Sequence, residues 1–256
     1  MKPEVFLTCE DDIHDWMLNT AGIDRQSYDF NRDDDSITGT HINIISEHIK
    51  SIPIKFRFCA FFEIYAPNLK TFDNVPTRTN RIIDPSYSFY NTNDVDWTTF
   101  HVNQINNLYL CNIESFDLSD MRIKSIHRLS FIAQKQAKND YTRSKITSAP
   151  DIIFDCSILE NCASKIYELV ICNYEINNIK NITSLVTNTR QNYTFVDIKF
   201  ESPSSKYDYS KGTSQQKCLK LKEIIDNYIH IDPRERPEYV MDCAVDLAEE
   251  GFGDNI

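Results

Sequence analysis

The chain has 256 residues, a net charge of −11, 41% hydrophobic residues and 12% aromatic residues. This apolar content supplies a core and excludes a disordered chain, while the acidic balance counts against binding to nucleic acid or to an acidic membrane surface. The five glycines do not lie between a strand and a helix, which excludes the familiar phosphate-binding loops.

The first predicted element is a helix that begins near Thr8 and ends before Gly22. Thr8 and Asp11 form an acidic variant of the capping box, and Gly22 suits the end of a helix. The helix has an apolar stripe formed by Ile13, Trp16, Met17 and Ala21. Acidic residues from Glu10 onward leave no room for a signal-peptide core. No run of about eighteen apolar residues is present to span a membrane, so we expect an intracellular protein of the nucleus or cytoplasm.

The next segments alternate between helical and extended patterns. Ile42, Ile45 and Ile49 predict a helix over 41–51, and the period of two over 54–65 predicts a strand. Prolines with Asn and Asp predict a long irregular loop over 66–97. Two further strands are predicted over the ranges 98–103 and 107–113.

Helical signals dominate the second half of the chain. Predicted helices lie near 120–138, after the capping box of Ser157 and Glu160, and near 179–186. Short strands are predicted over 151–155 and 194–200. A polar segment, 201–213, is predicted to be flexible and to precede two helices, at about 214–230 and 237–250, that form a hairpin over 214–251. We find no internal repeat. The sequence therefore predicts a helix-rich α+β fold in a single compact domain, 1–256, with a long irregular loop and mobile terminal segments.

Two groups of residues resemble metal ligands. The densest is formed by Cys9, Glu10, Asp11, Asp12, His14 and Asp15. Acidic residues in the first turn of a helix also favour its dipole, and this is the stronger interpretation. His41 and His48 share a face of the predicted helix but lack a third ligand. The sequence therefore predicts no metal ligand, no catalytic residue and no cofactor-binding residue, and we expect no enzyme.

Two further features have structural interpretations. The eight cysteines contain no CxxC pair, so we expect reduced, buried thiols, with intermolecular disulfides in an assembly as the alternative. The run 224–237 looks like the last helical subdomain of protein kinases. The chain lacks the glycine-rich loop and the Asp-Phe-Gly metal ligand of that family, so we interpret the run as a helix, a turn and a second helix.

The twelve residues from Pro76 to Tyr87 read Pro-Thr-Arg-Thr-Asn-Arg-Ile-Ile-Asp-Pro-Ser-Tyr. This stretch is similar to two short pieces of baculovirus polyhedrins, Pro-Thr-Arg-Pro-Asn-Arg and Arg-Ile-Val-Glu-Pro-Ser-Trp, here run together. The β-rich pattern and the basic segment of those proteins are absent, so a nudivirus-like polyhedrin fits better. The resemblance implies a viral occlusion-body matrix protein that forms an intracellular crystalline lattice.

We therefore expect a structural, self-assembling protein whose partner is itself, as a homo-oligomer or lattice. Its 13 Tyr and 15 Phe suit dry contacts between subunits. The loop 66–97 and the segment 201–213 are the predicted lattice contacts. Two alternatives stay open: a non-enzymatic viral interaction protein that binds a host or viral partner, and an unrecognised enzyme whose site is assembled from scattered residues.

Overall fold

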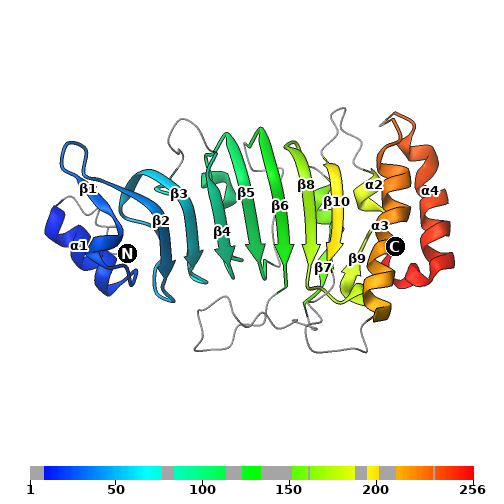
Figure 1. Ribbon diagram of the computed structural model, residues 1–256, viewed down its shortest axis with the longest axis horizontal. Helices are drawn as coiled ribbons and strands as arrows, with labels where there is room; N and C mark the ends of the chain where they lie inside the picture. Colours follow the sequence, from blue (N-terminus) through cyan, green and yellow to red (C-terminus); the bar gives the residue numbers. More distant parts are fainter. Residues whose placement is uncertain are drawn as a thin grey trace. The chain divides into compact units, whose positions relative to one another are not determined.

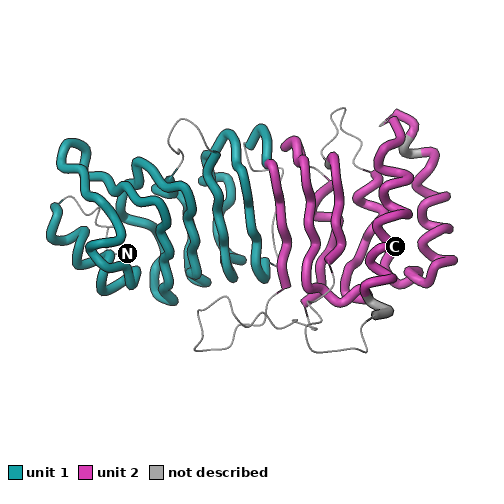
Figure 2. Tube along the Cα trace, viewed as in Figure 1, with its two compact units in different colours: residues 1–115, 120–126 teal, residues 116–119, 127–256 magenta. Residues whose placement is uncertain are grey.

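The computed structural model describes residues 9–76, 84–113, 123–133, 152–160, 162–187, 195–201, 212–232 and 234–256. The chain divides into two compact units (Figure 2). Unit 1 consists of residues 1–115 and 120–126, and unit 2 of residues 116–119 and 127–256. Both tryptophans of the chain, Trp16 and Trp97, belong to unit 1.

Unit 1 is built on parallel strands that follow one another in sequence order (Figure 1). Strand β1 pairs antiparallel with β2, and β2, β3, β4 and β5 are parallel neighbours. Its elements are α1 (Glu10–Asn19), η1 (Arg25–Ser27), β1 (Asp29–Asn31), β2 (Ser36–Ile45), β3 (Lys55–Tyr65), β4 (Ser86–Tyr90), η2 (Trp97–Thr99) and β5 (Gln104–Cys111).

Unit 2 places three neighbouring strands, β6, β8 and β10, beside a pair of helices. The first two residues of β6 are assigned to unit 1. Helix α3 packs along β10, and α4 packs on α3 (Figure 1). The elements are β6 (Ser125–Ile132), β7 (Phe154–Asp155), η3 (Cys156–Leu159), β8 (Lys165–Cys172), η4 (Ile176–Asn178), β9 (Ile179–Lys180), α2 (Ser184–Thr187), β10 (Phe195–Glu201), α3 (Gly212–Ile229), α4 (Arg236–Leu247), η6 (Ala248–Phe252) and η7 (Gly253–Asn255).

The predicted helix-rich α+β class is wrong. Among the described residues, eight strands belong to the main sheet structure against four α-helices, and one of those helices is only four residues long. Successive strands lie side by side in sequence order, and the segments between them return the chain to the same edge. Each unit therefore has the strand arrangement of a β-solenoid.

A six-residue pattern recurs in these strands, so the expectation of no internal repeat is also wrong. Its fourth and sixth residues are large and buried, and its first residue is apolar in most strands. The register of strand pairing places residues at the same pattern position side by side: Phe62 pairs with Tyr87, and Tyr87 with Leu108. The buried fourth and sixth residues are Ile42 and Ile44, Phe62 and Ile64, Tyr87 and Phe89, Leu108 and Leu110, Leu129 and Phe131, Leu169 and Ile171, and Ile198 and Phe200.

A left-handed asparagine directly follows three described strands of the main sheet. Asn91, Asn112 and Asn173 have φ of 55°, 54° and 64°, directly after β4, β5 and β8. Asparagine tolerates this conformation better than other residues with a side chain. The Asn91 N–H donates to the Cys111 carbonyl, and the Asn173 N–H donates to the Glu201 carbonyl. Each asparagine therefore turns the chain off the sheet while its backbone still extends the ladder.

Aromatic clusters fill the space behind the strands in each unit. In unit 1 the Phe72 ring centroid lies 4.8 Å from those of Phe89 and Trp97 and 5.3 Å from that of Phe100. In unit 2 the Phe154 centroid lies 4.7 Å from that of Phe131 and 5.2 Å from that of Tyr174. These rings come from both strands and connections, so each repeat buries its apolar face against its own return segment.

Several predicted elements are confirmed and several are wrong. The first helix, the strands at 54–65 and 194–200 and the last two helices occur as α1, β3, β10, α3 and α4. Three predicted helices are wrong, because β2, β6 and β8 occupy those positions. The predicted loop 66–97 contains β4, and the predicted strand over 98–103 is absent: η2 and an irregular segment lie there. Thr8 and residues 202–211 lie outside the described residues.

Candidate binding face

The six-residue pattern leaves some of its other residues exposed on the outer face of the strands, although its fifth residue is buried in β6 and β8 (Ser130 and Val170). In β8 the outer-face residues are Tyr167 and Glu168, and in β10 they are Val196, Asp197 and Lys199, all at least partly exposed. Register pairs Glu168 with Asp197. Because the strands pair in parallel register, side chains at the same pattern position of neighbouring strands line up in rows.

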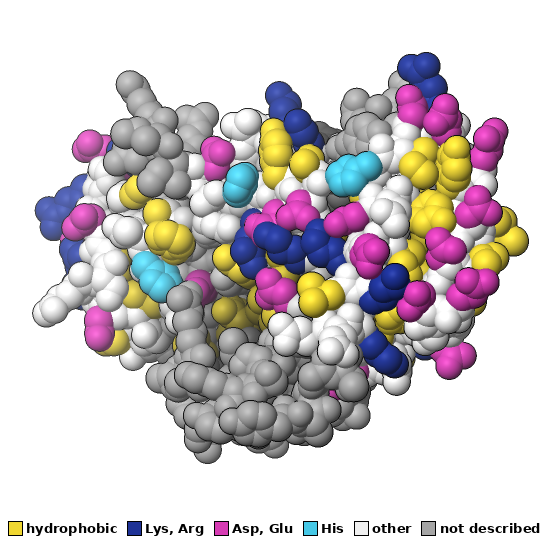
Figure 3. All heavy atoms as spheres, turned by 45° about the vertical axis from the view of Figure 1, so that its right-hand side comes forward, with side chains coloured by type: hydrophobic (Ala, Val, Ile, Leu, Met, Phe, Trp, Pro, Cys, Tyr) yellow, Lys and Arg dark blue, Asp and Glu magenta, His cyan; other side chains and the backbone are white. Residues whose placement is uncertain are grey.

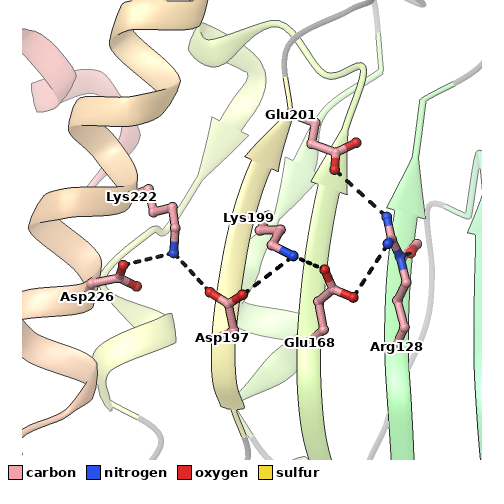
Figure 4. A network of polar contacts seen from close by, with 8 residues as sticks. Arg128, Glu168, Asp197, Lys199, Glu201, Lys222 and Asp226 are labelled. Atoms are coloured by element: carbon pink, nitrogen blue, oxygen red, sulfur yellow. Dashed lines mark hydrogen bonds and ion pairs between the residues drawn. The ribbon is translucent and has the colours of Figure 1, made fainter.

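A chain of ion pairs runs along this face of unit 2 (Figure 4). Arg128 of β6 lies between two carboxylates, with Nη1 3.4 Å from Glu168 Oε2 and Nη2 3.8 Å from Glu201 Oε1. The Lys199 ammonium donates to the other oxygen of Glu168. Its nitrogen also lies 3.5 Å from Asp197 Oδ2. One cation therefore links β6 to both carboxylate strands, and a second links β8 to β10.

Helix α3 extends the same network. The Lys222 ammonium donates to Asp197 Oδ1 at 2.9 Å and to Asp226 Oδ2 at 2.8 Å. Asp226 lies one turn after Lys222 on the same helix, so the pair is local, whereas Asp197 belongs to β10. Lys222 therefore ties the helix to the edge strand, and Figure 4 shows the contacts continuing from Arg128 to Asp226.

These charges are only partly shielded from water. Side-chain exposure ranges from 18% for Glu168 to 45% for Glu201. Burial alone would raise the pKa of Asp197, but Lys222 and Lys199 lower it below its ordinary value. The hydrogen bond to Glu168 raises the pKa of Lys199. Burial opposes the charge of Lys222, yet Asp226 and Asp197 raise its pKa overall. These three shifts all favour the charged forms of Asp197, Lys199 and Lys222.

A less polar row borders the network. Tyr167 is 40% exposed and Val196 is 44% exposed. The His127 ring centroid lies 5.8 Å from that of Tyr167, and the Lys165 ammonium lies 4.6 Å from the centroid of the same tyrosine ring. Residues 127, 167 and 196 each precede the charged residue of their strand. The face therefore offers an aromatic and aliphatic row beside a charged one.

The arrangement suits binding better than proton transfer. A general acid needs a carboxyl group whose pKa is raised toward the working pH, but that of Asp197 is lowered. A lysine nucleophile needs a lowered pKa, but those of Lys199 and Lys222 are raised. What the network provides is a set of side chains held in fixed positions by one another.

The corresponding face of unit 1 is less charged. Phe61 is 50% exposed on β3, and the His41 ring on β2 lies 6.1 Å from it, centroid to centroid. His41 Nε2 lies 3.5 Å from Glu63 Oε2. His41 and His48 do not share a helix, because His41 lies in β2 and His48 follows that strand. This pair thus has no common face on which to hold a metal.

The acidic cluster at the start of α1 forms caps and ion pairs. Cys9 Sγ accepts from the Asp12 N–H at 3.4 Å, and Glu10 accepts from Arg32 Nε at 2.8 Å. His14 Nδ1 lies 2.6 Å from the Tyr28 hydroxyl. In the part of the chain that the structure describes, no three His, Cys, Asp or Glu side chains come together as a metal site would require.

The cysteines differ in accessibility. Cys9 is exposed and Cys172 is intermediate, while the six others are buried. Burial raises the pKa of Cys59, Cys172 and Cys243 to about 12. These thiols are therefore packed as small apolar groups, and Cys9 is the one open to reagents and partners.

The kinase-like run 224–237 spans the end of α3, a turn and the start of α4, as its helix-turn-helix interpretation predicts.

Within the described ranges, no helix has the length and apolar content needed to cross a membrane. Comparisons with protein-family models, with curated proteins and with solved structures give no match for this chain. The polyhedrin resemblance stays a prediction. Its residues 77–83 lie outside the described residues, and Ser86 and Tyr87 belong to β4.

Proposed function

We propose that the protein is a non-enzymatic interaction module that binds a partner protein on the outer sheet face of unit 2. The observation that carries this proposal is the ion-pair chain from Arg128 to Asp226, which fixes side chains of three strands and a helix beside the exposed row of His127, Tyr167 and Val196.

The repeat pattern supports this proposal. Buried residues at the first, fourth and sixth positions match the L-x-x-L-x-L spacing of leucine-rich repeats, in which each repeat supplies one strand and a helical or 3₁₀ return. The 3₁₀ turns η2 and η4 lie in two such returns. Solenoids of this kind present extended surfaces for binding.

The energetics of the face point the same way. A partner loses less free energy on binding when the receptor side chains are already ordered. Tyrosine and arginine are enriched among the residues that dominate interface energies, and Tyr167 and Arg128 stand in adjacent rows. Surface ion pairs contribute little to stability, about 0–1 kcal/mol each. The presence of six of them in one network is therefore better explained by recognition than by folding.

Peptides selected from a random phage-displayed library on the whole protein test the proposal. Their affinities are then measured by fluorescence anisotropy on the wild type, Tyr167→Ala, Arg128→Ala and Phe61→Ala. Phe61 is the matched control, because it is an exposed aromatic residue (50%, against 40% for Tyr167) on a strand of unit 1. We expect Tyr167→Ala and Arg128→Ala to weaken binding about tenfold, or about 1.4 kcal/mol, with Phe61→Ala unchanged. If neither Tyr167→Ala nor Arg128→Ala changed the affinity of the peptides, the proposal would be contradicted.

Self-assembly into a lattice stays a second prediction, and the cysteines constrain its form. Since Cys9 is the exposed thiol, disulfides through it would join chains in pairs rather than in a network. Light scattering across neutral to alkaline pH tests assembly directly. Particles that dissolve near pH 10, where tyrosines ionise, would support it, and a small species of constant size would oppose it.

A further inference from the structure

The C-terminal helix α4 has an inner and an outer face. Cys243 and Leu247 are fully buried, and Phe252 of η6 is 1% exposed. These residues pack α4 on the rest of unit 2, where the Tyr228 hydroxyl of α3 donates to Asp246 at 2.8 Å. A terminal element that caps stacked repeats needs a polar outer face to remain soluble. The outer face of α4 departs from this expectation.

Two large apolar side chains project from that outer face. Met241 is 71% exposed and Val245 is 50% exposed. They are one helical turn apart, so they lie one above the other on the helix. Ala248, also exposed, continues the line. Single exposed apolar residues need no explanation, but an aligned stripe on a capping helix does.

An acidic stripe lies directly beside the apolar one. Residues 238–250 contain five acidic side chains and no basic one: Glu238, Asp242, Asp246, Glu249 and Glu250. Glu238 and Asp242 lie three residues before Met241 and Val245, and Glu249 lies four residues after Val245, so they border the stripe. Figure 3 shows apolar and acidic side chains mixed over the C-terminal helices.

Three of these charges, Asp246, Glu249 and Glu250, lie near the carboxyl end of the helix. Acidic groups at that end oppose the helix dipole. Lys220 offsets one of them, with its Nζ 3.4 Å from Glu250 Oε1. Within the described residues, Asp242 and Glu249 make no ion pair. Negative charge without an ion-pair partner, beside exposed apolar groups, indicates a surface suited to a partner of opposite charge.

We propose that the outer face of α4 docks a basic amphipathic helix of a partner protein. The apolar side of that helix covers Met241 and Val245, and its flanking Lys or Arg side chains pair with Asp242 and Glu249. This is the helix-on-helix mode in which apolar anchors repeat at helical spacing. A second copy of this chain is a poor occupant, because a symmetric contact through the same patch sets acidic stripe against acidic stripe.

The test uses two fluorescein-labelled peptides with leucines at identical helical spacing. In one peptide all the remaining positions are lysine, and in the other they are glutamate. Their binding to the full chain is measured by fluorescence anisotropy. We expect the lysine peptide to bind and the glutamate peptide not to bind. The Met241→Ala/Val245→Ala double variant removes apolar contact without changing charge, and should weaken binding about tenfold or more.

Two further variants separate this site from general attraction to an acidic protein. Leu219→Ala, at a residue of α3 that is 62% exposed, should bind like the wild type. Asp242→Lys with Glu249→Lys should lose the lysine peptide and gain the glutamate peptide. Full binding by the Met241→Ala/Val245→Ala variant would overturn the proposal, since charge alone would then explain the affinity. A dimer that this variant dissociates, detected by light scattering, would also overturn it.

Discussion

Replacement of Leu169 by alanine tests whether the repeated pattern builds the core of unit 2. Leu169 is the fourth residue of the pattern in β8, is fully buried and pairs with Ile198 of β10. The change removes three carbon atoms, worth about 0.8 kcal/mol each or roughly 2.4 kcal/mol in lost transfer free energy. The cavity left between strands adds to this, so we expect a total loss of about 3–4 kcal/mol.

The loss is measured by urea unfolding followed by far-ultraviolet circular dichroism. Val196→Ala is the matched control, because it shortens an aliphatic side chain of unit 2 that is 44% exposed. Surface changes of this kind usually shift the free energy of unfolding by less than about 0.5 kcal/mol. If Leu169→Ala cost no more than Val196→Ala, the fourth position would not be a core position and the repeat would lose its physical basis.

Three further predictions concern turns, charge and thiols. Asn173→Ala should destabilise the fold by about 1–2 kcal/mol in chemical denaturation, whereas Asn173→Gly should be tolerated, because φ there is 64°. Since Asp197 has a lowered pKa, the stability it adds over Asp197→Asn should be present at neutral pH and vanish as the pH falls through that pKa; a constant difference in thermal melts would refute this. An alkylating reagent should modify Cys9 first, and Cys9→Ser should remove the fast phase seen by mass spectrometry.

Elements with one strong local signal could be predicted from the sequence. Helix α4 begins at a proline, and Gly251 with φ of 85° follows its last regular turns. These are the terminal preferences of helices. Strand β3 begins with an alternation of charged and aromatic residues, Lys55-Phe56-Arg57-Phe58. In such segments one periodicity fits and the other does not, so the interpretation is secure without tertiary information.

Two of the three misassigned helices, those at β6 and β8, share a cause. The repeated pattern separates its first and fourth residues by three positions, which is also a helical spacing, and only its last interval is two. Ile126 and Leu129 in β6, and Ile166 and Leu169 in β8, therefore read as helical pairs. Clear alternation is also missing where three consecutive residues are buried, as at 169–171 of β8. Pairing with the neighbouring repeat decides between helix and strand.

The candidate face could not be predicted for a related reason. Arg128, Glu168 and Asp197 lie at the same pattern position in β6, β8 and β10, but are separated by tens of residues of chain. The signal that finds them is the alignment of successive patterns by their buried fourth residues. Once Leu129, Leu169 and Ile198 are aligned, the preceding charged residues form one row, and the ion pairs follow from their signs.

Because both tryptophans lie in unit 1, intrinsic tryptophan fluorescence reports on the unfolding of that unit alone. Trp97 is buried in the aromatic cluster with Phe72 and Phe89, and Trp16 lies in α1. Intrinsic emission excited at the indole band therefore follows the melting of unit 1, while unit 2 contributes to the dichroic signal but not to this emission. In Leu169→Ala, separate transitions in tryptophan emission and in circular dichroism would show that the two units unfold independently. Coincident transitions would show that they unfold cooperatively, so that a change in unit 2 also destabilises unit 1.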